Sequence, residues 1–396
     1  MHTIQKESLP QMINEIQDEV IQWRRYLHAR PELSFQEVQT SQYIYDTLKS
    51  FGGLKLSRPT ETSVMARLIG SEPGKVLAIR ADIDALPIEE ENDFDYVSTN
   101  IGVMHACGHD GHTAILLGTA KILSRFKDQI EGEVRFLFQH GEEQLPGGAQ
   151  EMIDAGVMEN VDFVIGAHLW SPIEVGKVFT TSGPLMAAAD IFNIKAFGKG
   201  GHSALPHHTI DSLAVGMQVV NNLQHIVSRN TDPFENLVLS VTKFTAGTSH
   251  SIIPETATIV GSVRSFNKEV RESVPEYMEQ IVKGVTEAHG ATYTLDYQWG
   301  YGPVINDEKA TRVIQETITD IFGEKALLIQ NPMMISEDFS AYQQKAPGCF
   351  FFIGAGNQEK GITYPHHHPK FSLDEKSLDI GVKIFVHAAF RFLNIQ

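Results

Sequence analysis

A thiol and two imidazoles occur close together in the segment MHACGHDGHTA, residues 104–114. Cys107 and His109 are separated by one residue, so a thiolate and an imidazole can reach one ion. Zn²⁺, Ni²⁺ and Co²⁺ accept such a mixed set of ligands. His112 follows three residues later, and we expect it to support the site rather than bind metal. The alternative interpretation is a buried structural cysteine beside histidines that cap a helix.

Carboxylates and another histidine come just after three strand-like segments. The segments VLAIR, VRFLFQ and DFVIGA lead respectively to Asp82 and Asp84, to Glu142 and Glu143, and to His168. Because ligands collect beyond the carboxyl ends of the strands in an open α/β sheet, we expect these side chains to share one site. The alternative for any single pair is a surface loop or a helix cap, and for Glu142 and Glu143 it is a solvated loop.

Three adjacent histidines, His366, His367 and His368, occur in the segment TYPHHHPKF. One of them can face inward while its neighbours face solvent, and the spacing alone does not select which. A purification tag is the weaker interpretation, because the cluster lies inside the chain.

These residue types together predict hydrolysis of an amide bond with two divalent ions. The pKa of water falls from about 15.7 toward ~7 on a metal, and a second ion can polarise the carbonyl group. A carboxylate beside the water must move the proton, and Glu142 suits that role. We expect Asp84 to orient the site from behind the ligands.

The composition is that of a folded globular protein, with 42% apolar and 20% charged residues. A chain of 396 residues exceeds what one hydrophobic core usually serves, so we expect two domains. The net charge of -17 disfavours nucleic acid and anionic membranes as partners.

Location is predicted from what the sequence lacks. No apolar run is long enough for a membrane span, and the start MHTIQKESLP has no apolar centre of a signal peptide. Only Cys107 and Cys349 occur, too few for a disulfide framework. We therefore expect a cytoplasmic protein.

Helical and strand-like patterns alternate in the first part of the chain and again in the last part. This alternation predicts an α/β fold, a doubly wound mixed sheet, for residues 1–182 and 299–396. Between them, three strand-like segments and two helical ones predict a smaller inserted α+β domain over 183–298. The expected helices are 11–29, 38–51, 111–126, 147–155, 209–228, 268–288, 308–322 and 373–393, and the expected strands include 64–69, 76–79, 134–138, 161–165 and 349–354.

The chain resembles the aminoacylase and carboxypeptidase-like zinc metallopeptidase family, in its branch of hippurate hydrolases, N-acetylamino-acid deacetylases and auxin-conjugate hydrolases. The resemblance runs nearly end to end. It rests on RRYLHARPELSFQE, RADIDALPIEE, MHACGHDGHTA, GEE, GAH, GKGGHSALPH, VRSF, SEDFS and HHPKF.

The resemblance implies a binuclear metal site and a lid that often mediates dimerisation in relatives. It implies that Cys107 is a bridging thiolate, that Glu142 is the general base, and that a lid histidine, His202, stabilises the oxyanion. It also implies that Arg264 grips the substrate carboxylate, as a planar bidentate donor does well. The other implied metal ligands are His109, Glu143, His168 and His367, the last because Pro369 fixes the register of HHPKF.

Three positions depart from the pattern of the family. Ser251 stands where many relatives carry an asparagine that contacts the carbonyl or oxyanion. His140 and Gly141 replace the usual Pro-Ala before the two glutamates, and His368 replaces the common serine after the ligand histidine.

The leading hypothesis is a metal-dependent amidohydrolase that cleaves N-acyl (acetyl or aromatic acyl) L-amino acids with a metal-activated water. We expect Zn²⁺, with Mn²⁺, Ni²⁺ and Co²⁺ open, and a homodimer formed through the lid. The alternatives are a dipeptidase or exopeptidase of the same clan, and a metal- or peptide-binding protein without turnover. A nucleotide binder is disfavoured, because GKGGH has no Lys-Ser/Thr after it.

Overall fold

The computed structural model describes residues 9–393 and divides into two compact units. Unit 1 comprises the chain up to Leu185, Ile305–Asn331 and the chain from Asp338 on, and unit 2 comprises Met186–Val304 and Pro332–Glu337. The short return segment Pro332–Glu337 has no counterpart in the predicted boundaries. That unit 2 acts as a lid or dimerisation domain stays a prediction.

Unit 1 is built around a mixed sheet with the strand order β1-β2-β4-β3-β5-β16-β6-β15. The central strands β4, β3, β5 and β16 are parallel, whereas β1 and β2 pair antiparallel with their neighbours. Strand β6 pairs antiparallel with β16 and parallel with β15. The strands are β1 Lys55–Ser57, β2 Val64–Ile69, β3 Glu72–Asp82, β4 Glu131–Gln139, β5 Phe163–Glu174, β6 Val178–Phe179, β15 Leu327–Leu328 and β16 Gly348–Gly356.

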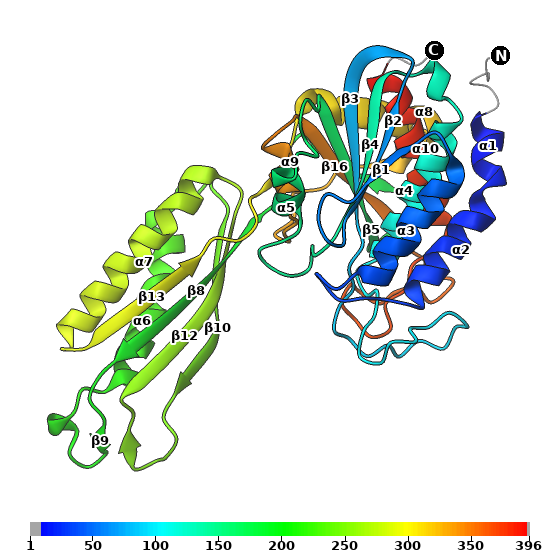
Figure 1. Cartoon of the computed structure of the whole chain (residues 1–396). Coiled ribbons are helices and arrows are strands. Elements are labelled where there is room, and N and C mark those ends of the chain that lie inside the picture. The colour runs from blue at the N-terminus through cyan, green and yellow to red at the C-terminus, as the bar shows by residue number, and fades with distance from the viewer. Residues whose placement is uncertain (1–8, 394–396) are drawn as a thin grey trace. The chain divides into compact units, whose positions relative to one another are not determined.

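Helices cover both faces of this sheet (Figure 1). The long helices α4, α8 and α10 pack on one face, and α2 and α3 contact α4, while the short helices α5 and α9 contact each other away from that layer. The helices of unit 1 are α1 Leu9–Glu15, α2 Gln17–His28, α3 Val38–Phe51, α4 His109–Ser124, α5 Ala149–Asp154, α8 Glu308–Phe322, α9 Ser340–Gln343 and α10 Lys376–Phe392.

The apolar run of β16 explains why the sheet is covered on both faces. Every residue of this strand is buried. Successive side chains of a strand point to opposite faces, and Phe351 and Ile353 belong to the core beneath the long helices. Phe350 instead packs against Phe339, at the start of α9. An all-apolar strand is typical of the buried parallel centre of an α/β sheet.

The carboxyl ends of the central strands position the metal-type side chains. β3 ends at Asp82, β4 ends at Gln139 just before the two glutamates, and α4 begins at His109. The sequence-based strand over 161–165 stops before His168, but β5 continues to Glu174 because β16 pairs with it as far as that residue. His168 therefore lies within the strand.

An ion cluster on β2 and β4 gives a prediction for the pH dependence of stability. The Glu133 carboxylate accepts hydrogen bonds from Nε of Arg67 at 2.6 Å and Nε of Arg135 at 2.7 Å. Burial alone would raise the pKa of Glu133, but the two guanidinium groups hold it below its ordinary value. This carboxylate therefore stabilises the fold above its unfolded pKa, and the contribution is lost as the pH falls through the lower folded pKa.

We expect Glu133→Gln to lower the free energy of unfolding by about 2 kcal/mol at neutral pH, and by much less near pH 3. Urea denaturation of the wild type and the variant at the two pH values measures this gap, the difference between their free energies of unfolding. A gap that is equal at both values would contradict the assignment.

Unit 2 is an antiparallel sheet with two helices, and its strand order is β10-β12-β8-β13. Alternate residues of β8 are buried, which includes Phe192 and Ile194, and these pack against Leu223 of α6 and Met278 of α7. Strand β8 is thus one of the strand-like segments expected within 183–298. The elements are β8 Ala188–Phe197, β9 Gly201–His202, α6 Ser212–His225, β10 Leu237–Ala246, β11 Ile252–Ile253, β12 Thr256–Ser265, α7 Lys268–Ala288 and β13 Thr292–Gln298.

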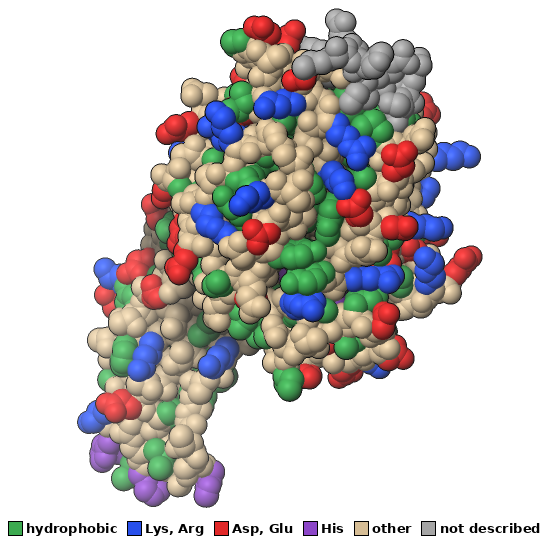
Figure 2. All heavy atoms as spheres, turned by 45° about the vertical axis from the view of Figure 1, so that its right-hand side comes forward, with side chains coloured by type: hydrophobic (Ala, Val, Ile, Leu, Met, Phe, Trp, Pro, Cys, Tyr) green, Lys and Arg blue, Asp and Glu red, His purple; other side chains and the backbone are tan. Residues whose placement is uncertain are grey.

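Histidines gather at one end of unit 2, as the space-filling view shows (Figure 2). The exposed histidines of its loops are His202, His207, His208 and His250. Elsewhere in that view, acidic and basic side chains are interspersed. Among residues 9–393, none of the helices combines the length and apolar composition that crossing a bilayer requires.

Candidate metal centre

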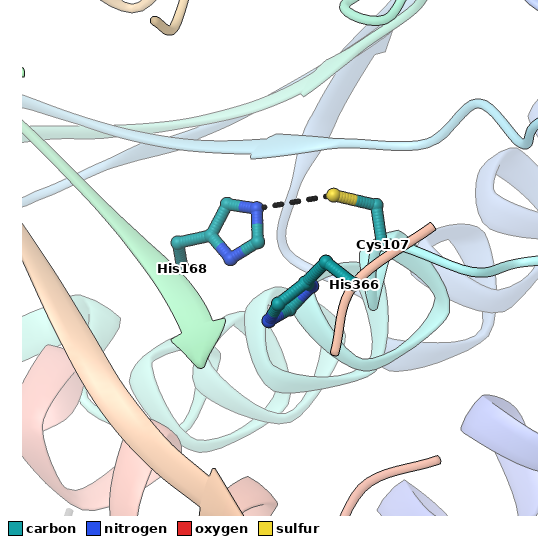
Figure 3. A group of neighbouring side chains, drawn as sticks. All are labelled: Cys107, His168 and His366. Carbon is teal, nitrogen blue, oxygen red and sulfur yellow. Dashed lines mark hydrogen bonds between the residues drawn. The ribbon is translucent and has the colours of Figure 1, made fainter. Parts of the chain in front are cut away.

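Cys107 and His168 meet inside unit 1 (Figure 3). The Sγ atom of Cys107 lies 3.4 Å from Nε2 of His168, and both side chains are buried. Nδ1 of His168 donates to the carbonyl oxygen of Leu169 at 2.7 Å. Because a carbonyl only accepts, Nδ1 carries the proton and Nε2 presents its lone pair toward the sulfur. Burial lowers the pKa of His168 well below its ordinary value, so the ring is neutral.

His109 is oriented in the same way by a carboxylate. Its Nδ1 donates to Oδ1 of Asp84 at 3.2 Å, which leaves Nε2 as the ring nitrogen that a cation can bind in place of a proton. Nε2 of His109 lies 3.8 Å from Oε1 of Glu143. The Sγ atom of Cys107 and ligand atoms of His109 and Glu143 all lie within 4.8 Å of one another. Oδ2 of Asp84 also accepts the backbone N–H of Glu143 at 3.0 Å. Asp84 thus orients two of the predicted ligands at once.

His367 reaches the same carboxylate from the other end of the chain. Its Nε2 lies 3.4 Å from Oε1 of Glu143. The backbone N–H of His367 donates to the carbonyl oxygen of Ala106 at 2.9 Å, beside the segment that carries the thiol. Its φ of 63° is a left-handed value that non-glycine residues adopt at a cost, often at functional sites.

The neighbours of His367 take different positions. His366 lies with Cys107 and His168 in a second close group (Figure 3), but its Nε2 accepts the backbone N–H of Ser171 at 3.2 Å. The ring of His368 faces elsewhere, since its Nδ1 accepts the N–H of Lys370. If His367 is not a metal ligand, His366 is placed to take that role, whereas His368 is not.

His112 is a buried support of the centre, as expected. Its Nδ1 donates to Oδ1 of Asp82 at 2.6 Å, and its Nε2 accepts the backbone N–H of Leu169 at 2.8 Å. Both nitrogens are thus engaged, and the second bond fixes the strand beside His168. Asp82 is held in turn by Nη1 of Arg80 at 2.8 Å.

Without a bound cation, the centre has an excess of carboxylates, which favours protonation of the groups beside them. Burial would lower the pKa of His109, but Asp82 and Asp84 outweigh it and raise that pKa to about 10. Burial first, and then the charge of Glu143, raise the pKa of the Cys107 thiol well above its ordinary value. A divalent cation would replace these protons and satisfy the carboxylates.

Two buried polar atoms test whether the residues fit metal ions. Within the described chain, Nε2 of His109 and Oε1 of Glu143 are buried and have no hydrogen-bond partner. Unpaired buried polar atoms are costly, unless a ligand takes them up. Both atoms belong to predicted ligands, and sulfur, imidazole and carboxylate donors suit Zn²⁺ and its neighbours. The residues present therefore fit a metal centre.

Glu142 lies beside this centre, and only 8% of it is exposed. Its charge contributes to the raised pKa of Cys107, so the carboxylate lies close to the thiol. It is absent from the groups that contain Cys107 or His109 and belongs instead to a separate group of carboxylates that includes Asp338. Its proposed role is therefore that of a base beside the predicted ligands.

The remaining predicted residues, His202, Ser251 and Arg264, belong to unit 2. His202 is exposed on β9, and its Nδ1 accepts the N–H of Ala204 at 3.1 Å. The carbonyl oxygen of Ser251 accepts the N–H of Ser203 at 3.0 Å. Arg264 on β12 is half-buried, and burial lowers its pKa.

Sequence reasoning missed two supports of the centre, Ser34 and Glu37. Oγ of Ser34 donates to Oδ2 of Asp84 at 2.7 Å, and Glu37 accepts the backbone N–H of Gly141 at 2.8 Å. The available signal was the polar pair inside PELSFQE, a segment otherwise read only as part of the family pattern.

A doubly covered mixed sheet with sulfur, imidazole and carboxylate groups at the carboxyl ends of its strands defines a metal-dependent hydrolase of the metallopeptidase class. The chain belongs to peptidase family M20/M25/M40, whose model matches residues 78–391. The suspected family and the predicted fold class are thereby confirmed.

Three similar proteins illustrate the membership. An N-acyl-L-amino acid amidohydrolase of Geobacillus stearothermophilus is 63% identical over 76% of this chain and 81% of its own length. Thermostable carboxypeptidase 2 of Saccharolobus solfataricus is 40% identical over 98% of this chain and 99% of its own. The solved structure of the Bacillus subtilis YXEP protein, described as a dinuclear metal binding peptidase, has a TM-score of 0.84 at 35% identity and covers 97% of this chain and 100% of that one.

These relatives confirm the predicted enzyme class, a hydrolase that acts on linear amides, and support two divalent ions. The individual residue roles stay predictions. In the structure, the thiol, the three imidazoles and the Glu143 carboxylate lie together in unit 1, as expected.

Proposed function

We propose that this chain hydrolyses the amide bond of N-acylated L-amino acids whose acyl group is acetyl or aromatic. The observation that carries the proposal is the convergence of Cys107 and His109 with Glu143, His168 and His367, residues up to 260 positions apart in the sequence. A relative that is named N-acyl-L-amino acid amidohydrolase supports the substrate class.

We assign the binding of two divalent ions to those five side chains, with Zn²⁺ as the first choice and Mn²⁺, Ni²⁺ and Co²⁺ as alternatives. When bound, the ions acidify the attacking water and polarise the substrate carbonyl. Asp84 holds His109 in the tautomer whose Nε2 can bind a cation, and it also holds the backbone of Glu143.

Glu142 is the proposed general base. Its carboxylate takes the proton of the attacking water and passes it to the nitrogen of the leaving amine, which departs as the neutral amino group. We assign the stabilisation of the oxyanion to His202, with Ser251 as a further polar contact of the substrate.

A panel of substrates tests this function. Purified protein loaded with each candidate metal should hydrolyse N-acetyl and N-benzoyl L-amino acids, and a chelator should stop the reaction. Release of the free amino acid, measured by reaction with a primary-amine reagent, gives the rate. No hydrolysis of any acylated amino acid with any metal would refute the proposal.

A carboxypeptidase or dipeptidase of the same family is the second candidate, and the 40% identical thermostable carboxypeptidase favours it. A free substrate α-amine needs an acidic partner, whereas an acylated nitrogen does not. Comparing free with N-acetylated dipeptides separates the two functions: faster cleavage of the free dipeptides would replace the first proposal with the second.

Arg264 is the proposed anchor of the substrate carboxylate. Its Nη1 donates to Oγ of Ser336 at 3.0 Å, and among the described residues it forms no ion pair with an acidic group. A half-buried guanidinium without a carboxylate partner is suited to bind one from a ligand.

We expect Arg264→Ala to raise KM about 10- to 100-fold with little change in kcat, because hydrogen bonds to a charged group contribute about 1.5–3 kcal/mol. The variant should also lose any preference for an N-acetyl amino acid over its uncharged amide. Arg229→Ala, at an exposed arginine of the same unit, is the control. An unchanged preference for the acid would exclude Arg264 as the anchor.

We further propose a homodimer formed through unit 2. One edge of its sheet is strand β10, whose later residues Thr242–Thr245 are exposed, and such an edge can pair with another strand. Light scattering of the purified protein tests the dimer. The cytoplasmic location stays a prediction, in keeping with the two free cysteines.

A further inference from the structure

The turn His140–Glu143 carries both the proposed base and a proposed ligand, and it begins with an unusual backbone. Gly141 has a φ of 62°, a left-handed value. The position of Glu142 and Glu143 therefore depends on what holds this glycine in place.

One carboxylate outside the metal centre holds it. Oε1 of Glu37 accepts the N–H of Gly141 at 2.8 Å and the N–H of Phe35 at 2.9 Å. Its Oε2 accepts the hydroxyl of Thr62 at 2.9 Å. Glu37 is completely buried, so these bonds are shielded from water.

The ring of Phe35 closes the same turn by contact. A Cβ atom on Gly141 would lie 2.8 Å from Cζ of that ring, so only glycine allows the approach. Phe35 itself has a φ of 64°. Its ring packs edge-on against the ring of His140, with 5.3 Å between the ring centroids. Two turns with left-handed residues, Phe35 and Gly141, are thus joined through one glutamate that accepts a hydrogen bond from each.

Ser34 extends this support to the ligands. Its Oγ donates to Oδ2 of Asp84 at 2.7 Å, the same oxygen that accepts the N–H of Glu143. Residues 34–37 therefore contact the turn at two points, Gly141 directly and Glu143 through Asp84.

We propose that Glu37 is a positioning residue for the reaction, because its hydrogen bond to Gly141 fixes the turn that presents Glu142. The inference rests on the proposed base role of Glu142. Glu37 itself acts only through the backbone of the turn.

Three variants test the proposal. Glu37→Ala removes all three hydrogen bonds that the carboxylate accepts, and we expect kcat to fall about 10- to 100-fold, with KM and metal content close to the wild type. Glu37→Gln should restore most of the rate, because its amide oxygen can still accept both N–H groups and its NH₂ can meet the hydroxyl of Thr62. The aspartate of Glu37→Asp is too short to reach the N–H groups of both Phe35 and Gly141, so this variant should be as slow as the alanine variant. It replaces Glu37→Ala in the test if the alanine variant does not fold.

Glu32→Ala is the matched control. The Glu32 carboxylate also accepts two backbone N–H groups, from Gln39 and Thr40, but these lie at the start of α3 and not at the turn. Hydrogen exchange of the peptide that contains Gly141 adds a readout that is independent of turnover. It should accelerate in Glu37→Ala and stay unchanged in Glu32→Ala.

Each outcome decides one point. A Glu37→Ala or Glu37→Asp protein with the kcat of Glu32→Ala would overturn the positioning role, as would a Glu37→Gln protein as slow as the alanine variant. Failure of the wild type to cleave any acylated amino acid would instead refute the proposed function. In that case the exchange at Gly141 still decides whether Glu37 holds the turn.

Discussion

Glu142→Ala should lower kcat for N-acetyl amino acids at least ~10²-fold, because general-base catalysis typically contributes a factor of about 10² to 10⁴. The buried carboxylate lies close to the Cys107 thiol but outside the groups of metal-type atoms around it. We therefore expect the variant to keep its full metal content. Steady-state kinetics and elemental analysis of the same preparation measure both effects.

Two further variants make this result specific. Glu142→Asp keeps a carboxylate and should recover part of the rate, whereas Glu159→Ala, at an exposed glutamate of unit 1, should behave as the wild type. Full activity of Glu142→Ala would end its assignment as the base, and loss of metal from it would make it a ligand.

Cys107→Ala should lose at least one of the two ions and lower the rate of hydrolysis at least ~10²-fold, because it removes a thiolate that the resemblance implies to be bridging. The thiol lies 3.4 Å from Nε2 of His168. Elemental analysis by mass spectrometry after dialysis counts the ions, and the same sample gives the rate.

Cys349→Ala is the matched control for this variant. Cys349 is also buried and free, but its Sγ contacts the hydroxyl of Thr180, the residue after β6. The control should keep both ions even if it is less stable. Two ions in Cys107→Ala would remove the thiolate from the ligand set.

The elements that carry the metal-type residues could be predicted well because their patterns are local. The run CFFFIG, residues 349–354, predicted β16. The single helix expected over 11–29 is divided in the structure into α1 and α2, with Ile16 between them, and α2 ends at His28. Helices α3, α7 and α8 have the predicted bounds. In the helices the apolar positions face one core, and in β16 every position is buried, so burial and pattern agree in each segment.

The strand β13 was missed, although Tyr293, Leu295 and Tyr297 alternate with exposed residues. It lies at the edge of its sheet, where one row of side chains stays in water and the composition TYTLDYQ is only weakly apolar. The return of Pro332–Glu337 to unit 2 had no local signal either, because it depends on contacts such as the N–H of Ala187 with the carbonyl oxygen of Met333.

The candidate centre was predictable in its residue types and less so in its supports. The residue types at the strand ends and in MHACGHDGHTA pointed to a metal centre, but it was the family resemblance that implied the five proposed ligands, including His367, whose register Pro369 fixes. Glu37 could not be found in this way, since its bond to Gly141 joins residues 104 positions apart and follows from the fold alone. Spacing identifies side chains that share a motif, not a carboxylate that holds a distant backbone.

Counting the metal ions of the wild-type protein tests the central claim most directly. Elemental analysis of protein purified without added chelator should find two divalent ions per chain, and their removal should abolish hydrolysis of N-acylated amino acids until metal is returned. Fewer than two ions in a preparation that hydrolyses these substrates at full rate would contradict the account.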